Sequence, residues 1–296
     1  MSRIHEIQNS QFKVSIQQTG AELCSIQSLG SGKEYIWGGN PDVWAAHAPN
    51  LFPVIGRLKN GAFVYRGKEY PCPKHGFIRK NENIVLLEKT RNSLSFGLNF
   101  SEQTLEIYPF KFEFIIKYLL EGSQVVIEHT ITNAGEEPML FALGGHPGFA
   151  CPLNEDESYT DYYLEFEKPE TAETWCVQKD GLISTTTQPA FDEPTIINLH
   201  PDIFMNDALV FKNLNSSKVS LKSRKSKQVL SVCFEGFPYL GIWAKPGAEF
   251  VCIEPWIGIA DRCDTDRDFE TKEALVKLSP AKSFAATYSI GIEEYA

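Results

Sequence analysis

The chain has little positive charge. Its 296 residues include 28 Lys and Arg against 38 Asp and Glu, which gives a formal charge of −10. Nucleic-acid binding needs a concentrated cationic surface, so this balance argues against that function. No apolar run approaches the roughly 18 to 20 residues of a membrane helix, and the first residues lack the apolar stretch of a signal peptide. We therefore expect no membrane association and a cytoplasmic location.

Closely spaced cysteines and familiar cofactor motifs are also absent. The closest two of the seven cysteines, Cys252 and Cys263, are 11 residues apart, which fits neither a disulfide framework nor a CxxC metal clip. GxSxG, GxxxxGK[ST], GxGxxG and HExxH motifs are missing. The acidic run that starts at Asp264 has Phe269 where a calcium loop needs glycine. The sequence therefore predicts no metal and no nucleotide cofactor.

Alternation of apolar and polar residues with period two is the main structural signal. It recurs in five segments that we interpret as half-buried strands: 12–16, 94–100, 112–120, 125–131 and 284–292. Hairpins are predicted at 112–131, 63–70 and 218–234. The hairpin at 218–234 has five cations in ten residues, and we interpret these as charges on a solvated turn rather than as an anion site. The only predicted helix is Glu270 to Leu278. We expect one all-β domain over residues 1–296, a large antiparallel sandwich or barrel.

Four segments have sequences unlike an ordinary strand or turn, and they contain Arg57, His75, His146 and Glu254. The glycines and proline around His146 indicate a loop in which the backbone can approach a ligand closely. Glu254 stands among apolar residues, so its carboxylate is either paired structurally or held in a half-dry site that raises its basicity. One such residue alone more often has a structural role. Four in comparable contexts favour a functional site.

The sequence resembles the aldose 1-epimerase (galactose mutarotase) family, and within it the LacX-like branch. The matching stretches are FPVIGRLKNG at 52–61, KHGF at 74–77, GGHPGF at 144–149, NDALVF at 206–211 and CIEPWIG at 252–258. The resemblance implies a supersandwich of antiparallel strands with an open carbohydrate-binding cleft. It also implies cofactor-independent interconversion of the α and β anomers of an aldose.

The resemblance assigns roles to individual residues. His146 matches the histidine that donates a proton to the ring oxygen, and Glu254 matches the carboxylate that accepts a proton from the anomeric hydroxyl. His75 matches a second histidine that binds the sugar, and Arg57 and Asp207 match residues on sugar hydroxyls. Trp256 is expected to offer its face to the sugar. Opening a hemiacetal ring needs one acid and one base, so these residue types suit the reaction.

The substrate stays open at this stage, because five cations surround the first two matching stretches: Arg57, Lys59, Lys74, Arg79 and Lys80. These cations either form a phosphate-binding rim for a hexose 6-phosphate or are simply charged residues that flank the loops, and we favour the second interpretation. The partner is expected to be a sugar or sugar phosphate, and the oligomeric state stays unassigned. A non-catalytic sugar-binding or regulatory protein on the same scaffold is the main alternative. A polysaccharide lyase or hydrolase accessory domain is a weaker one.

Overall fold

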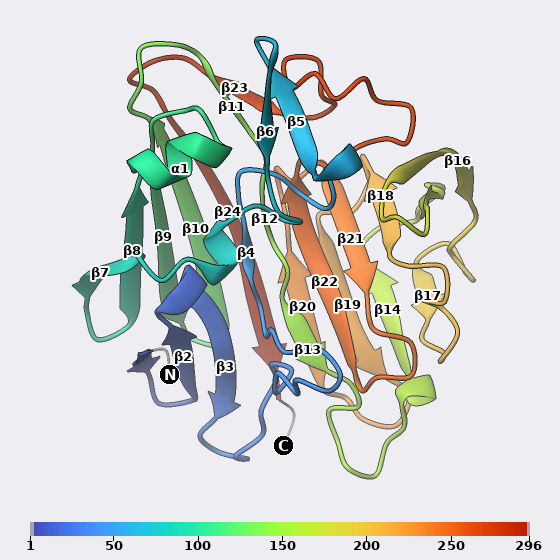
Figure 1. Cartoon of the computed structure of the whole chain (residues 1–296). Helices are drawn as coiled ribbons and strands as arrows, with labels where there is room; N and C mark the ends of the chain where they lie inside the picture. Colours follow the sequence, from blue (N-terminus) through green and yellow to red (C-terminus); the bar gives the residue numbers. More distant parts are fainter. Residues whose placement is uncertain (1–2, 295–296) are drawn as a thin grey trace.

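A computed structural model describes residues 3–294, which form mainly antiparallel strands (Figure 1). The larger sheet has nine strands, in the spatial order β17 (Ile196–Asn198), β14 (Tyr162–Phe166), β19 (Lys218–Ser223), β20 (Val229–Cys233), β24 (Ser283–Glu293), β10 (Gln124–Asn133), β9 (Phe112–Glu121), β8 (Ser93–Asn99) and β7 (Val85–Lys89). The second has eight: β16 (Ile183–Gln188), β15 (Thr174–Val177), β18 (Leu209–Lys212), β21 (Tyr239–Trp243), β22 (Phe250–Ile257), β12 (Leu143–Gly145) and β4 (Asn50–Leu51), with β13 (Gly148–Ala150) also paired to β22. The predicted all-β antiparallel sandwich is confirmed.

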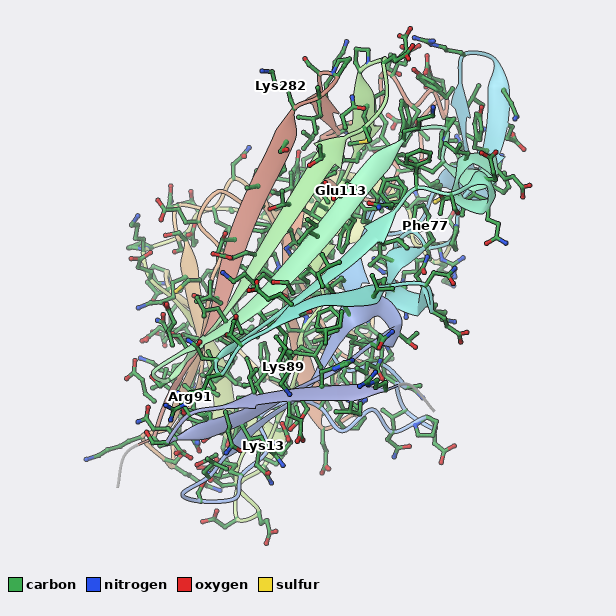
Figure 2. All side chains as sticks on the ribbon, turned by 90° about the vertical axis from the view of Figure 1, so that its left-hand side faces the viewer. Lys13, Phe77, Lys89, Arg91, Glu113 and Lys282 are labelled. Atoms are coloured by element: carbon green, nitrogen blue, oxygen red, sulfur yellow. The ribbon has the colours of Figure 1, made fainter. Side chains whose placement is uncertain are left out.

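Smaller elements surround these two sheets. They are a three-stranded sheet of β1 (Ile4–Gln8), β2 (Phe12–Gln17) and β3 (Glu22–Ser28), the pair β5 (Ala62–Tyr65) and β6 (Lys68–Pro71), the pair β11 (Met139–Phe141) and β23 (Val276–Leu278), the helix α1 (Glu102–Ile107), and 3-10 turns at Thr19–Ala21, Lys59–Gly61, Ile78–Lys80 and Tyr159–Asp161. Figure 2 looks onto the nine-stranded sheet, where β24, β10, β9 and β8 run side by side and the three-stranded sheet, with Lys13 on β2, crosses below them.

The predicted strand alternation appears directly as burial. Along β9 the residues alternate between buried and half-buried positions, and Phe114 and Ile116 are fully buried. Successive side chains point to opposite faces of a strand, so every second residue enters the core. The turn between β9 and β10 contains Gly122, whose positive φ of 56° is easiest for glycine. The five predicted strands and all three predicted hairpins are present.

One hydrophobic core fills the space between the two large sheets. Leu230 and Ile290 of the nine-stranded sheet belong to it, as do Ile242 and Ile253 of the eight-stranded sheet. All of β22 is buried, and alternate residues anchor the strand in this core while the residues between them point to the other side of the sheet.

The helix predicted from Glu270 to Leu278 is wrong. The segment forms turns and ends in β23, which pairs with β11. Ala274 has a φ of +66°, and a left-handed residue interrupts a right-handed helix. The buried ammonium of Lys272 also ties the segment down, because it donates hydrogen bonds to the Ile259 carbonyl and the Asp261 carboxylate. These contacts outweigh the helical spacing of the apolar residues.

The described residues contain no helix long and apolar enough to cross a membrane. In the cation-rich hairpin of β19 and β20, Lys222 and Lys225 form ion pairs with Glu165 and Asp161. Those contacts agree with the interpretation of this hairpin as a surface feature rather than an anion site.

Candidate active site

Glu254 lies at the centre of the eight-stranded sheet. Period two places Val251 and Ile253 of β22 in the core and turns Glu254 and Trp256 to the other face. The Glu254 side chain is only 1% exposed. Opposite Glu254, β21 has Gly241, and a Cβ there would lie 2.4 Å from ring atoms of Trp256. The glycine therefore makes room for the indole beside the carboxylate.

His146 is held above Glu254 by two short strands. Both β12 and β13 pair with β22, and His146 lies in the irregular residues between them, as the GGHPGF sequence predicted. The backbone N–H of His146 donates to the Pro49 carbonyl at 3.0 Å. Its Nε2 lies 3.2 Å from Glu254 Oε2. The contact is an ion-pair approach rather than an aligned hydrogen bond, because Oε2 has no hydrogen-bond partner among residues 3–294.

Trp44 covers the other side of His146. The two rings stack with centroids 5.1 Å apart. Trp44 can reach this position because residue 148 is glycine, since a Cβ there would lie 2.7 Å from Trp44 Cζ3. The glycine after GGHP therefore does not widen the cavity; an indole fills the space that a side chain would occupy.

His75 approaches His146 edge-on, with ring centroids 5.4 Å apart. The Gly56 N–H donates to His75 Nδ1 at 3.2 Å, which leaves Nε2 to carry the proton of the neutral ring. The backbone of His75 is left-handed, with φ of 65°. The next residue must be glycine, because a Cβ on Gly76 would lie 1.9 Å from the Phe52 carbonyl oxygen. The KHGF motif thus positions an N–H donor beside the His146–Glu254 pair.

Burial dominates the electrostatics of the three titratable groups. It lowers the pKa of His146 to about 3, and the nearby charges of Arg79 and Lys74 act in the same direction. It raises the pKa of Glu254 well above the usual value. Burial, followed by the charge of His146, also lowers the pKa of His75 well below its usual value. Burial thus favours the uncharged form of both members of the pair, the neutral imidazole and the protonated carboxyl group, although the two side chains are close enough for an ion pair.

These groups line one cavity, whose volume including its open mouth is about 650 Å³. Its wall combines aromatic, titratable, cationic and small apolar residues: Trp44, Gly56, Lys74, His75, Arg79, His146, Val177, Gly181, Ile183, Asp207, Ala208, Val210, Trp243, Glu254, Trp256 and Ala260. An apolar wall with a few convergent polar groups is typical of a small-molecule site.

The cavity contains five of the six predicted site residues. Besides His75, His146 and Glu254, it is lined by Asp207 and Trp256. Asp207 is exposed at the rim, and its carboxylate accepts a hydrogen bond from the Ala208 N–H at 2.8 Å. Trp256 is 6% exposed, and its indole N–H has no hydrogen-bond partner among residues 3–294. The indole nevertheless lies close to the Glu254 carboxylate, where it opposes the effect of burial, which raises the pKa of that group.

Arg57 is the predicted site residue that lies outside this cavity. It is exposed and lines a neighbouring cavity, about 1510 Å³ with its open mouth included, together with Lys59 and Lys74. Its side chain packs against Gly181, which belongs to the wall of the His146 cavity. Arg79 is the arginine inside; it is half-buried, and its guanidinium forms no hydrogen bond or ion pair with residues 3–294.

Sequence reasoning did not assign Trp44 or Trp243 to the site. Trp243 on β21 contacts His146 edge-on, with centroids 5.9 Å apart, and also packs on Trp44. Neither tryptophan stands in a matching motif. Trp243 lies on a strand beside the predicted site, so only the strand order shows that it faces the site. Trp44 lies in an irregular segment before β4, and no local pattern gives the path of that segment.

Known proteins share this sequence and fold. Residues 3–273 match the sequence model of the family described as Aldose 1-epimerase. The chain belongs to the aldose 1-epimerase family. Two LacX proteins of Lactococcus lactis subsp. lactis, plasmid and chromosomal, are each 33% identical to it, over 97% of this chain and 98% of theirs. The aldose 1-epimerase resemblance inferred from the motifs, including its LacX-like branch, is confirmed.

Solved structures from the same group superpose closely on this aldose 1-epimerase family member. A galactose mutarotase related enzyme from Lactobacillus acidophilus has a TM-score of 0.92 at 36% identity, covering 99% of this chain and 98% of that one. A galactose mutarotase-like protein from Lactobacillus casei ATCC 334 also gives 0.92, at 27% identity, covering 98% and 100%. The predicted supersandwich of this family is therefore the fold of the chain.

The raised pKa of Glu254 predicts how stability depends on pH. Below the usual carboxyl pKa of 4.5 both folded and unfolded chains are protonated at this position. As pH rises through the folded pKa, the unfolded chain ionises first and folding stability falls. Glu254→Gln cannot ionise, so we expect it to be more stable than the unmodified protein, with a gap that widens from pH 5.5 to pH 8. Urea unfolding across this range measures the gap, and the exposed Glu249→Gln is the control expected to show none. A constant gap would contradict the burial argument.

Proposed function

We propose that this protein is a mutarotase that interconverts the α and β anomers of an aldohexose without a cofactor. The observation that carries the proposal is the His146–Glu254 pair, 3.2 Å apart at the base of a cavity with aromatic walls. Membership of the aldose 1-epimerase family supports the same reaction type. The names of the similar Lactobacillus structures support galactose as one substrate.

The proposed reaction moves two protons and breaks one bond. Glu254 accepts the proton of the anomeric hydroxyl while His146 donates a proton to the ring oxygen, and the C1–O5 bond breaks to give the open aldehyde. Rotation about C1–C2 then presents the other face of the aldehyde, and the steps reverse. At the end of each turnover, His146 and Glu254 hold the same protons as at the start. The buried pair thus carries one proton throughout, on His146 while the ring is closed and on Glu254 while it is open.

Lys74 acts on both members of the pair. Against the larger effect of burial, its positive charge lowers the pKa of Glu254 and so favours the carboxylate that acts as base, while it also lowers the pKa of His146. The Nε2–H of His75 is available to a sugar oxygen, because Gly56 occupies Nδ1. Among the cavity tryptophans, Trp243 is the one proposed to meet the apolar C–H surface of a pyranose ring, because Trp44 is already stacked on His146 and Phe250. Asp207 at the rim is positioned for hydroxyls further from C1.

The substrate proposed is galactose, glucose or a hexose 6-phosphate. The phosphorylated form is supported by Lys74 and Arg79, which line the cavity and whose charged groups have no ion pair among residues 3–294. Lys59 does not contribute, because its ammonium donates to the carbonyls of Cys263 and Thr265. Among the cations near the first two motifs, Lys74 and Arg79 therefore face the cavity, whereas Lys59 stabilises a loop.

Arg79→Gln tests whether this cavity recognises phosphate. A hydrogen bond to a charged group contributes about 1.5–3 kcal/mol, so kcat/KM for a hexose 6-phosphate is expected to fall about 10- to 150-fold. Activity on the free hexose should change much less. The exposed neighbour Lys80 lies outside the cavity, and Lys80→Gln is the matched control expected to leave both substrates unaffected. An equal loss on free and phosphorylated sugars would assign Arg79 to the pyranose instead.

The direct test is the optical rotation of freshly dissolved α-galactose, α-glucose and their 6-phosphates. Purified protein is expected to accelerate the decay toward the equilibrium value for at least one of these sugars. A full panel of aldoses with no acceleration would overturn the proposed function.

A further inference from the structure

A third potential ligand lies beside the catalytic pair. Cys252 precedes Glu254 by two residues on β22, so both side chains are on the same face of the strand. His146, Cys252 and Glu254 each offer one ligand atom, all three residues are buried, and the three atoms lie within 4.8 Å of one another. No sequence motif for metal binding marks them, because the histidine comes from a loop more than a hundred residues earlier.

We propose that His146, Cys252 and Glu254 form a binding site for a borderline-soft divalent cation such as Zn²⁺. Imidazole nitrogen, thiolate sulfur and carboxylate oxygen are the ligands that Zn²⁺ uses in proteins. Three protein ligands with one open position are typical of zinc sites that admit an exogenous molecule. Calcium and magnesium prefer oxygen ligands and are not expected to bind here.

The geometry is close to that of a zinc site. Tetrahedral Zn²⁺ with bonds of about 2.0–2.3 Å separates its ligand atoms by roughly 3.3–3.7 Å. His146 Nε2 and Glu254 Oε2 are already 3.2 Å apart. All three ligand atoms lie within 4.8 Å of one another, so a side-chain movement of about 1 Å brings them to the spacing of ligands in a zinc site. Glu254 Oε2 is buried without a hydrogen-bond partner among residues 3–294, which leaves its lone pairs free for a cation.

The surroundings supply an entry path and a fourth ligand. The cavity of His146 and Glu254 is open at its mouth, so a hydrated cation can enter and retain one water. Cys252 is not part of the cavity wall; it lies behind it, where Gly148 and Trp44 pack. Binding displaces the thiol proton of Cys252 and the proton held by the His146–Glu254 pair, and both protons leave to solvent. The Cys252 thiol is thus a metal ligand only, and it takes no part in opening the sugar ring.

A bound cation would occupy the proposed acid and the proposed base together. On the proposed function, Zn²⁺ therefore inhibits mutarotation in competition with the sugar. Metal binding itself does not depend on that function and is measured separately, so that the failure of one proposal is distinguishable from the failure of the other.

The test is a titration of the purified chain with Zn²⁺ alone, followed calorimetrically, and with Co²⁺, followed by absorption. We expect one ion per chain and a thiolate-to-cobalt charge-transfer band in the near ultraviolet. Loss of an outer-shell partner costs about 10- to 100-fold in metal affinity, so loss of a direct ligand in Cys252→Ser should raise Kd by at least about 100-fold. The band should disappear, while anomer exchange in the absence of metal persists. Half-buried Cys263 provides the matched control, Cys263→Ser, which should bind as the unmodified chain does.

Two results would overturn the proposal. One is an unmodified chain that gives no charge-transfer band with Co²⁺, which needs no variant and so does not depend on whether Cys252→Ser folds. The other is unchanged Zn²⁺ affinity in Cys252→Ser or in Cys252→Ala. Inhibition by Zn²⁺ that is equal in the unmodified chain and both Cys252 variants would place the metal elsewhere and also contradict it.

Discussion

Glu254→Gln is expected to lower kcat/KM for anomer interconversion by about 10²- to 10⁴-fold, the usual contribution of one well-placed proton-transfer group. The amide keeps the shape of the carboxylate but cannot accept the anomeric proton. His146→Asn is expected to give a loss of the same size, because it removes the proton donor to the ring oxygen. The double variant should lose little more than either single one, since the two groups act as a unit.

Sugar binding provides the control for this loss. Trp44, Trp243 and Trp256 line the cavity, so a bound sugar should change the intrinsic fluorescence. Glu254→Gln is expected to retain that change, which separates a loss of chemistry from a loss of folding. Exposed Glu249 stands just before β22, and Glu249→Gln should be fully active. Normal turnover by Glu254→Gln would sink the assignment of the base.

Lys272→Met is expected to lower the free energy of unfolding by about 3–5 kcal/mol, the cost of breaking a buried ion pair by removing one partner. The side chains of Lys272 and Asp261 are 5% and 3% exposed, and their charged atoms lie 2.7 Å apart. The Lys272 ammonium also donates to the Ile259 carbonyl. Asp261 accepts the Lys59 N–H through its other oxygen. Methionine has a similar size but leaves the Asp261 carboxylate buried without its cation.

A surface ion pair gives the matched comparison. Arg66 and Glu137 lie 3.0 Å apart, but their side chains are 56% and 64% exposed. Exposed pairs contribute about 0–1 kcal/mol, so Glu137→Gln should scarcely move the urea midpoint. If Lys272→Met were no more destabilising than Glu137→Gln, the buried pair would not be holding together the segments around Ile259 and Lys272.

The strands could be predicted because the alternation of apolar and polar residues that specifies a strand lies within a single short segment of sequence. In β9 and β10 each apolar side chain is two residues from the next, and that spacing alone fixes which face enters the core. The helix at Glu270 to Leu278 was wrong because its fate depends on Asp261 and on pairing with β11, contacts that no local pattern contains. The real helix α1 was missed, since it spans only Glu102–Ile107 and offers a single signal, the cap formed by Ser101 and Thr104.

The candidate site was likewise only partly predictable from the sequence. His75, His146 and Glu254 stand in unusual sequence contexts. His146 and Glu254 meet because β12 and β13 pair with β22, and His75 is brought to them by its contact with Gly56 and the bridge between Phe52 and Gly76. The choice between Arg57 and Arg79 could not be made from sequence. Both arginines lie near a motif, and only the packing of Arg57 against Gly181 turns one of them away from the cavity of His146. The position of Trp243 likewise depends on the strand order, and that of Trp44 on the path of the segment before β4.

Anomer exchange measured by NMR in free and 6-phosphorylated hexoses at equilibrium tests the central claim most directly. It detects catalysis without a coupled enzyme and identifies the substrate class in the same experiment. We expect faster exchange between the α and β resonances with the unmodified protein, and an acceleration about 10²- to 10⁴-fold smaller with Glu254→Gln. Saturable sugar binding without acceleration of any hexose would contradict it and would favour a non-catalytic sugar-binding protein on this fold.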